Sequence, residues 1–163
     1  MWLDSVSVRE LVDVSQPAAP PAPPRKTVGE DLLSKGGKSA RWVISSPTKA
    51  GMVKKEADNV TVLTVKAKGS FIYNTRTKLV PGKEYRFAFE IKNDRPRLCS
   101  PSVRCGKQDF GCTLSPLADW QKGHIDFTVS EGKGDTALRF WAGNVMPGEH
   151  VRLRNISLKE LAK

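Results

Sequence analysis

The chain has 163 residues, with 27 Lys and Arg against 17 Asp and Glu and a formal net charge of +10. This length allows one domain with a hydrophobic core, and no apolar run approaches the roughly 20 residues that cross a bilayer, which excludes a membrane-spanning helix. The basic excess favours a polyanionic partner, or else only a soluble, lysine-rich exterior. Because the basic residues are spread over many segments, without a zinc-finger, RNA-recognition or P-loop motif, the sequence argues against nucleic acid.

The N-terminal part of the chain divides into a strand and a proline-rich linker. Residues 1–14 contain an alternating, strand-like segment, and residues 15–27 include five prolines between Pro17 and Pro24. Proline fixes φ and lacks an amide donor, so this linker is extended. We therefore expect a strand in 1–14, a linker in 15–27 and a β-domain in 28–163. The first residues lack the features of a signal peptide, so a signal on a longer parent, another export route and an internal location all stay open.

The N-terminal strand resembles the C-terminal end of the same chain. Residues 3–11 align without gaps to residues 153–161, with four identical positions. Chance is one explanation; another is that 1–14 is the last strand of a preceding domain copy. In a third, the strand completes the sheet of a neighbouring molecule, because strand addition uses main-chain hydrogen bonds and alternate side chains. The side chains that would set its register are Trp2, Leu3, Val6, Val8 and Leu11.

From residue 28 onward, short β-branched or aromatic stretches alternate with turn signals, and no amphipathic helix is evident. After a short apolar piece in 28–37, we expect strands at 41–45, 60–67, 70–77, 85–92, 124–129, 136–141 and 151–158. Residues 93–117 read as a long irregular segment. This pattern predicts an all-β fold, a two-sheet antiparallel β-sandwich of the jelly-roll type.

The clearest strand follows the Pro81-Gly82 turn. In it, Tyr85, Phe87, Phe89 and Ile91 alternate with Arg86, Ala88, Glu90 and Lys92. A period of two with aromatic residues on one side predicts one buried face and one charged, outward face.

Three cysteines, Cys99, Cys105 and Cys112, lie in the segment expected to be irregular. Their odd number allows at most one internal disulfide, which an exported protein would favour. His124 could add a fourth zinc ligand, but the spacing is not the C-x2-4-C that structural zinc sites use. The sequence therefore predicts no metal site here.

Five sequence motifs occur in an order that resembles a known family. They are Leu32–Gly37, then Trp42; Leu79–Phe89, matching L-x-P-G-K-x-Y-x-x-x-F; Trp120 before Ile125–Val129; Leu138–Phe140; and Gly148 before Val151–Leu158. This order resembles the β-sandwich carbohydrate-binding modules of the cellulose- and xylan-binding type, within the galactose-binding-like jelly rolls, over about residues 28–161. The resemblance implies a glycan bound along the concave sheet or on the loops at one end.

One departure from the family concerns metal binding. Its closing strand usually carries an Asp tied to a structural calcium, and here that position is Arg154, whereas Asp4 holds the equivalent place in the N-terminal segment. Calcium requires several hard oxygen ligands, so Arg154 argues against this site, and we expect no cofactor.

Candidate ligand-binding residues follow from strand alternation. Sugar binding needs flat aromatic faces together with polar groups for the hydroxyls. Outward positions in two strands are Arg86 with Glu90 and Arg139 with Trp141, while Phe71 and Tyr73 share one face that is either platform or core. Arginines beside an aromatic face also suit a carboxylated or sulfated glycan. The expected site is therefore Trp141, Arg139, Tyr73, Phe71, Arg86 and Glu90, whereas Trp42 and Trp120 are expected in the core.

The sequence contains no recognisable catalytic constellation. Glycoside hydrolysis needs two carboxylates across the scissile bond, and no such pair or nucleophile motif is visible. We therefore expect a non-catalytic glycan-binding or adhesion module of a larger extracellular or cell-surface protein, acidic glycans included. The alternative is a structural subunit of an extracellular filament or multidomain array, in which the chain binds copies of itself by donating residues 2–11.

Overall fold

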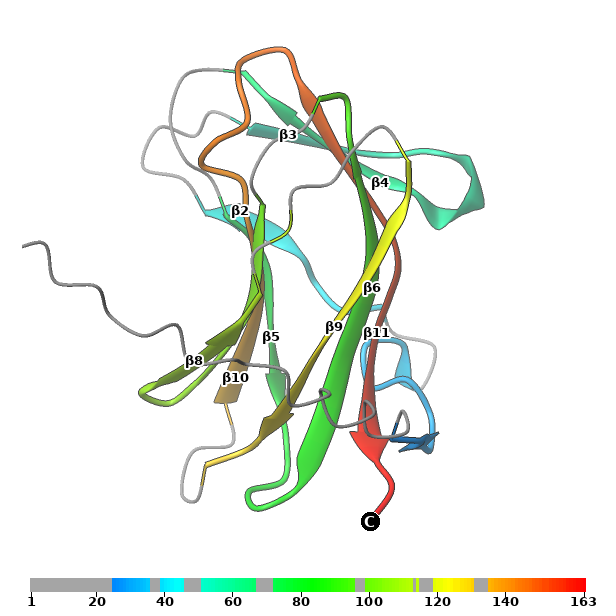
Figure 1. The fold of residues 1–163 in the computed structure, drawn as a ribbon, viewed down its shortest axis with the longest axis vertical. Coiled ribbons are helices and arrows are strands. Elements are labelled where there is room, and N and C mark those ends of the chain that lie inside the picture. Colours follow the sequence, from blue (N-terminus) through cyan, green and yellow to red (C-terminus); the bar gives the residue numbers. More distant parts are fainter. Residues whose placement is uncertain are drawn as a thin grey trace, which may run out of the picture.

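The computed structural model describes residues 25–35, 39–45, 51–66, 72–95, 99–112, 114, 119–130 and 135–163. In these residues two antiparallel sheets pack face to face, which confirms the predicted β-sandwich (Figure 1). Nothing in the described part is a helix long and apolar enough to cross a membrane. Outside the described residues lie the N-terminal strand, most of the linker, Phe71 and the assembly residues Trp2, Leu3, Val6, Val8 and Leu11, whose roles stay predictions.

The two sheets differ in size and in the order of their strands. The six-stranded sheet has the order β3-β4-β11-β6-β9, with β1 paired to β11, and the five-stranded sheet has the order β2-β5-β10-β7-β8. The strands of the first sheet are β1 (Thr27–Val28), β3 (Gly51–Lys55), β4 (Thr61–Val65), β6 (Glu84–Asn93), β9 (Gln121–Thr128) and β11 (His150–Leu161). Those of the second are β2 (Val43–Ser45), β5 (Ile72–Lys78), β7 (Ser100–Cys105), β8 (Gln108–Gly111) and β10 (Asp135–Trp141), and a short 3-10 turn, η2 (Ala57–Asn59), joins β3 to β4.

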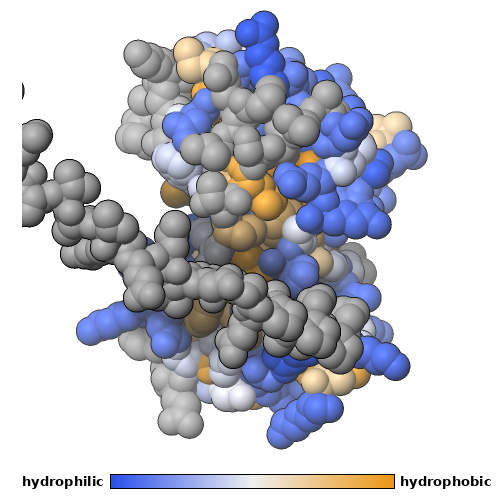
Figure 2. Space-filling model, viewed as in Figure 1, coloured by the Kyte–Doolittle hydropathy of each residue, from blue (hydrophilic) through white to orange (hydrophobic). Residues whose placement is uncertain are grey.

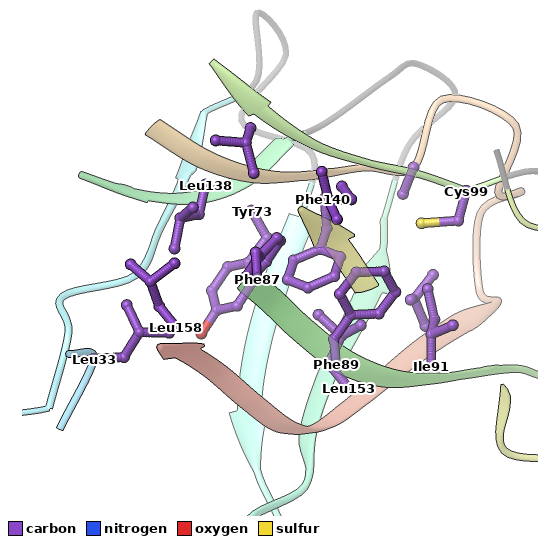
Figure 3. Packing of buried hydrophobic residues seen from close by; sticks show 14 of the residues in the cluster. Leu33, Tyr73, Phe87, Phe89, Ile91, Cys99, Leu138, Phe140, Leu153 and Leu158 are labelled. Atoms are coloured by element: carbon purple, nitrogen blue, oxygen red, sulfur yellow. The ribbon is translucent and has the colours of Figure 1, made fainter. Parts of the chain in front are cut away.

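Strand β6 supplies the centre of the core, as its alternation predicts. The rings of Phe87 and Phe89 lie 5.4 and 5.2 Å from the ring of Phe140 on the opposite sheet (Figure 3). Fully burying each such side chain contributes about 1.5–3 kcal/mol, so this contact holds the sheets together. The turn before β6 places Gly82 at φ 77°, a left-handed conformation that favours glycine, and the amide of Lys83 donates to the carbonyl of Val80 at 3.3 Å.

The expectation that residues 93–117 are irregular is wrong. Strands β7 and β8 form a hairpin there, in which Cys105 pairs with Gln108 across a turn that contains Gly106 at φ 59°. The inward positions of β7 are Pro101, Val103 and Cys105, which are all buried. Of these three residues only Val103 is β-branched and none is aromatic, so the segment carries little of the signal by which strands are recognised. For the same reason β3 was not predicted from the sequence, since its residues are Gly51-Met52-Val53-Lys54-Lys55, with one β-branched residue and no aromatic one.

The three cysteines pack in and beside this hairpin. Cys99 and Cys105 are buried and Cys112 is half-buried, and no disulfide joins any two of them. Among the residues that the structure describes, no cluster of three or more His, Cys, Asp or Glu could hold a metal ion.

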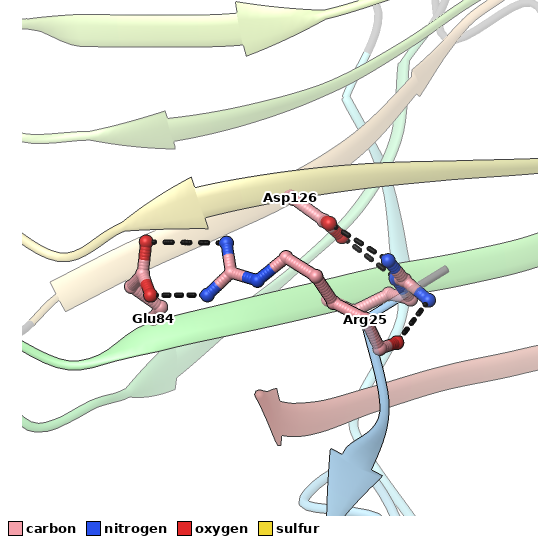
Figure 4. Close-up of polar contacts among 4 residues, drawn as sticks. Arg25, Glu84 and Asp126 are labelled. Atoms are coloured by element: carbon pink, nitrogen blue, oxygen red, sulfur yellow. Dashed lines mark hydrogen bonds and ion pairs between the residues drawn. The ribbon is translucent and has the colours of Figure 1, made fainter. Parts of the chain in front are cut away.

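The chain contacts the sandwich three residues before the boundary expected at residue 28. Arg25 pairs with Glu84, and its carbonyl accepts a hydrogen bond from Nη1 of Arg86 at 3.0 Å (Figure 4). Thr27 pairs with Leu161 in the short strand β1. These contacts fix the described part of the linker on the six-stranded sheet.

Apolar and hydrophilic residues segregate on the surface. Figure 2 shows apolar residues gathered in a hollow near the middle of the view, surrounded by hydrophilic side chains. Since the two sheets lie to either side of this region in the same view, the apolar material belongs to the layer between them (Figure 1).

Candidate functional site

The structure divides the expected site residues between opposite sides of the molecule. Trp141 and Arg139 lie on the outer face of the five-stranded sheet, whereas Arg86 and Glu90 lie on the outer face of the six-stranded sheet. Tyr73 lies between the sheets. The expected residues therefore do not form one site.

Tyr73 belongs to the core rather than to an exposed ligand platform. Its side chain is 2% exposed and stacks on Trp42, with ring centroids 4.8 Å apart. Burial raises the pKa of its phenol to about 12. The register explains this position, because Tyr73 pairs with Ile44 on one side and with the fully buried Phe140 on the other.

Among the described residues of the outer face of the five-stranded sheet, Trp141 is the half-buried aromatic residue. In the register of the sheet, Trp141 lies between Ile72 and Ser100, and Arg139 lies between Asn74 and Ser102. We call the outward side chains of Ser45, Ile72, Asn74, Ser100, Ser102, Asp109, Arg139 and Trp141 the Trp141 face. The serine side chains are short, and Trp141 stays partly exposed between its neighbours.

Gly143 determines how the indole lies. A Cβ atom at position 143 would be 2.1 Å from Cζ2 of Trp141, so the ring packs directly against the glycine backbone. Only a residue without a side chain permits this contact. The indole is therefore supported by its own chain while the side chain stays partly exposed.

Polar groups share this face with Trp141. Arg139 forms an ion pair with Asp109, whose side chain is 54% exposed. The Nδ2 amide of Asn74 donates to Oγ of Ser45 at 2.9 Å. These contacts hold a carboxylate, an amide and one hydroxyl group in fixed positions on the same face as an aromatic ring, an arrangement that suits a polyhydroxylated ligand.

The outer face of the six-stranded sheet carries several ion pairs. Arg86 donates to both carboxylate oxygens of Asp126, at 2.7 and 2.8 Å, and Nε of Arg154 donates to Glu90 at 2.7 Å. These hydrogen bonds lower the pKa values of Asp126 and Glu90. A hollow of about 320 Å³ lies between the pairs, lined by Ala88 and its charged neighbours.

The six-stranded face offers less to a sugar than the Trp141 face. The guanidinium of Arg154 lies 4.1 Å from the ring centroid of Trp120, so a cation already covers that aromatic ring. The charges of Arg86 and Glu90 are neutralised by Asp126 and Arg154, respectively. For these residues the expected role as ligand contacts stays a prediction.

The strand position that the family resemblance associates with calcium does not fit that ion. Arg154 places a cation there, and its contacts with Glu90 and Trp120 satisfy it without a metal. Calcium needs six to eight oxygen ligands, and Glu90 is already held by the guanidinium. Whether the protein uses any cofactor stays an expectation from the sequence.

A cavity of about 660 Å³ lies where η2, β3 and the segment before β2 approach β11. Trp42, which sequence reasoning assigned to the core, is half-buried in its wall. Strand alternation could not predict that Trp42 lines a cavity, because its exposure depends on the distance between segments that are far apart in the sequence. The sequence feature that could have indicated this cavity is the Asp58-Asn59 pair, which forms a turn in which both residues adopt φ 57°.

The fold is that of the β-sandwich carbohydrate-binding modules. Among solved structures, a family 4 carbohydrate-binding module superposes with a TM-score of 0.62 at 19% identity, covering 73% of this chain and 86% of that one. The module TmCBM61, solved with β-1,4-galactotriose, gives a TM-score of 0.55 at 15% identity, covering 73% and 88%.

The same fold also occurs inside a larger enzyme. The enzymatically active domain of tailspike protein 4 from bacteriophage CBA120 gives a TM-score of 0.61 at 14% identity, covering 73% of this chain but only 19% of that one. Comparison of the sequence with models of protein families and with curated proteins gives no match. At these identities, the likeness establishes the fold.

Proposed function

We propose that the chain is a non-catalytic carbohydrate-binding module whose glycan lies across the Trp141 face. The observation that carries this proposal is the half-buried indole of Trp141, packed on Gly143, on a face that also carries Arg139, Asp109 and Asn74. An indole offers the apolar side of a pyranose a flat surface, and the polar neighbours offer donors and acceptors to its hydroxyl groups. Carbohydrate-binding modules of the same fold also support a glycan-binding function.

The arrangement of the acidic residues supports a non-catalytic role. Asp126 pairs with Arg86, Glu90 with Arg154 and Asp109 with Arg139. Glycosidases that use two carboxylates place them on either side of the scissile bond, whereas these three carboxylates each face a cation.

The net charge of +10 extends the proposal to acidic glycans and to a place in a larger extracellular or cell-surface protein. Long-range attraction of a polyanion would be screened by salt, whereas stacking on Trp141 would not. An acidic glycan held mainly by charge therefore loses most of its affinity between low and high ionic strength.

Affinity electrophoresis through gels that contain neutral or acidic polysaccharides tests the proposal. We expect retardation in at least one gel, and loss of retardation for Trp141→Ala. Val80→Ala changes an exposed residue outside the Trp141 face and serves as the control, which should migrate like the wild type. Unretarded migration of the wild type in every gel, or equal retardation of Trp141→Ala, would contradict the proposal.

A further inference from the structure

The cavity beside Trp42 is built around a rigid aromatic wall. The Trp42 ring stacks on Tyr73 at an interplanar angle of 19° and lies 5.8 Å from the ring of Phe140. These contacts fix the indole from the core side, while the side chain still lines the cavity. The volume of about 660 Å³ falls within the range of about 300–1,000 Å³ that small-molecule sites occupy.

In the part of the chain that the structure describes, four charged side chains line the cavity, and two of them are engaged by the protein. Oδ1 of Asp31 accepts the backbone amides of Leu33 and Leu158, at 3.1 and 2.9 Å, and Arg154 pairs with Glu90. The remaining two are Lys55 and Glu56, which are neighbours in the sequence. Among the described residues, the cavity therefore keeps one cation and one carboxylate for a ligand, and the four charges cancel.

Lys55 reaches into the cavity without a carboxylate partner. Its ammonium group donates to the hydroxyl of Thr61, and no ion pair involves it among the described residues. Burial lowers its pKa. A partly desolvated ammonium group of this kind gains from a hydrogen-bond acceptor, such as the oxygen of a hydroxyl group.

Two asparagines in left-handed backbone conformations complete the wall. Asn59 has φ 57° and Asn155 has φ 50°, and both line the cavity although they lie on separate elements. Such conformations cost energy in residues other than glycine and persist where the surrounding structure imposes them. Each amide can donate and accept hydrogen bonds, and the amide of Asn155 also bonds to the carboxylate of Glu90.

We propose that this cavity is a second sugar site, which binds one uncharged pyranose unit at the end or branch of a glycan. The unit stacks on Trp42, and its hydroxyl groups bond to Lys55, Glu56 and the two amides. Balanced donors and acceptors suit an uncharged polyol, whereas a carboxylated sugar would bring its charge close to Glu56 and Asp31. This proposal rests on the glycan-binding function, but it makes the module bivalent, with an open face for a chain and a cavity for one unit.

The test follows the indole N–H signals of Trp42 and Trp141 separately in ¹⁵N-labelled full-length protein. The probes are xylohexaose, cellohexaose, mannohexaose and β-1,4-galactotriose. Val53→Arg places a long side chain at the cavity, which Val53 lines, and Met52→Arg places the same charge at a neighbouring exposed position that does not line it. We expect at least one probe to shift the Trp42 signal, with affinity reduced at least about tenfold in Val53→Arg and unchanged in Met52→Arg.

The two indole signals also separate this proposal from the first. A Trp42 response that persists in Trp141→Ala supports the cavity site. If only Trp141 responds, or if Val53→Arg leaves the Trp42 response intact, the cavity proposal is wrong, while the proposal that a glycan binds the Trp141 face stands. If only Trp42 responds, the cavity proposal stands and the Trp141 face does not bind these uncharged glycans. The absence of any response to all four probes overturns the cavity proposal, while the gels with acidic polysaccharides decide the proposal for the Trp141 face.

Discussion

The position of one side chain, the indole of Trp141, depends on the absence of another at Gly143. Because a Cβ atom at 143 would overlap the ring, Gly143→Ala should push the indole away from its backbone support. We expect glycan affinity to fall about tenfold and the free energy of unfolding to fall by about 1–3 kcal/mol, as overpacking does. Calorimetric titration and thermal unfolding measure the two effects.

A double-mutant cycle shows whether Gly143 acts through Trp141. Adding Gly143→Ala to Trp141→Ala should cause no further loss of affinity, since the ring that glycine supports is already gone. Additive losses would show that Gly143 contributes to binding by another route.

The cysteines provide a second test at the scale of single residues. Burial raises the pKa of Cys99 to about 12, and it also raises the pKa of the half-buried Cys112. Since the thiolate is the reactive form, alkylation of the native protein should be slow and should modify Cys112 first. Peptide mapping after iodoacetamide treatment measures this order, and early modification of Cys99 would contradict the described packing.

Alternation within a strand predicted the parts of the site that lie on regular, strongly amphipathic elements. Leu138 and Phe140 point inward on β10, so Arg139 and Trp141 had to point outward, and the structure places them there. The strand that contains Tyr73 was ambiguous because Thr75, a polar residue, shares its inward face. The hydroxyl of Thr75 is satisfied by the carbonyl of Arg41 at 2.8 Å, a contact between distant segments that no local pattern reveals.

The ion pair that joins β6 to β9 predicts a dependence of stability on pH. The Arg86 hydrogen bonds lower the pKa of Asp126 in the folded protein, so their stabilisation is present above the ordinary aspartate pKa and disappears as pH falls through the folded value. We expect Asp126→Asn to lower the free energy of unfolding by about 1–2 kcal/mol at neutral pH. The difference from the wild type should shrink from about pH 4 downward. Denaturant titrations at several pH values measure it, and a constant difference would contradict this account.

The bulge in β11 gives a prediction based on a matched pair of variants. The register shifts between Arg154 and Ser157, and Asn155 adopts φ 50° within the shift. Asn155→Gly should leave stability nearly unchanged, whereas Asn155→Ala should cost about 1–2 kcal/mol, because alanine tolerates the left-handed region poorly. Equal stability of the two variants in urea denaturation would contradict the described backbone.

At the scale of the whole molecule, much of the charge on the six-stranded sheet is neutralised locally. Arg25, Lys83, Arg86 and Arg154 each pair with a carboxylate, so their contribution to the field of the protein is reduced. The net charge of +10 nevertheless predicts attraction of acidic polymers at low salt. This attraction differs from stacking on Trp141, and only the stacking should survive at high salt.

Composition and turn signals predicted the sandwich because eight or so short strands without helices have few ways to bury their apolar faces. They could not predict the separation of Arg86 and Glu90 from Trp141, since strand order determines which sheet each strand joins. They also missed the cavity beside Trp42, whose walls come from segments spread between Asp31 and Ile156. The donation of residues 2–11 to a neighbouring molecule stays a prediction, which sizing of the full chain against a chain that begins at Arg25 tests.

The central claim is that a glycan stacks on Trp141. Its most direct test is the dissociation constant of the wild type and of Trp141→Ala for a polysaccharide that retards the wild type, measured by calorimetric titration at high salt. Because large aromatic contacts dominate binding interfaces, removing this ring should weaken binding by about tenfold or more, while the thermal unfolding of the variant remains close to that of the wild type. Equal dissociation constants for the two proteins would contradict the account.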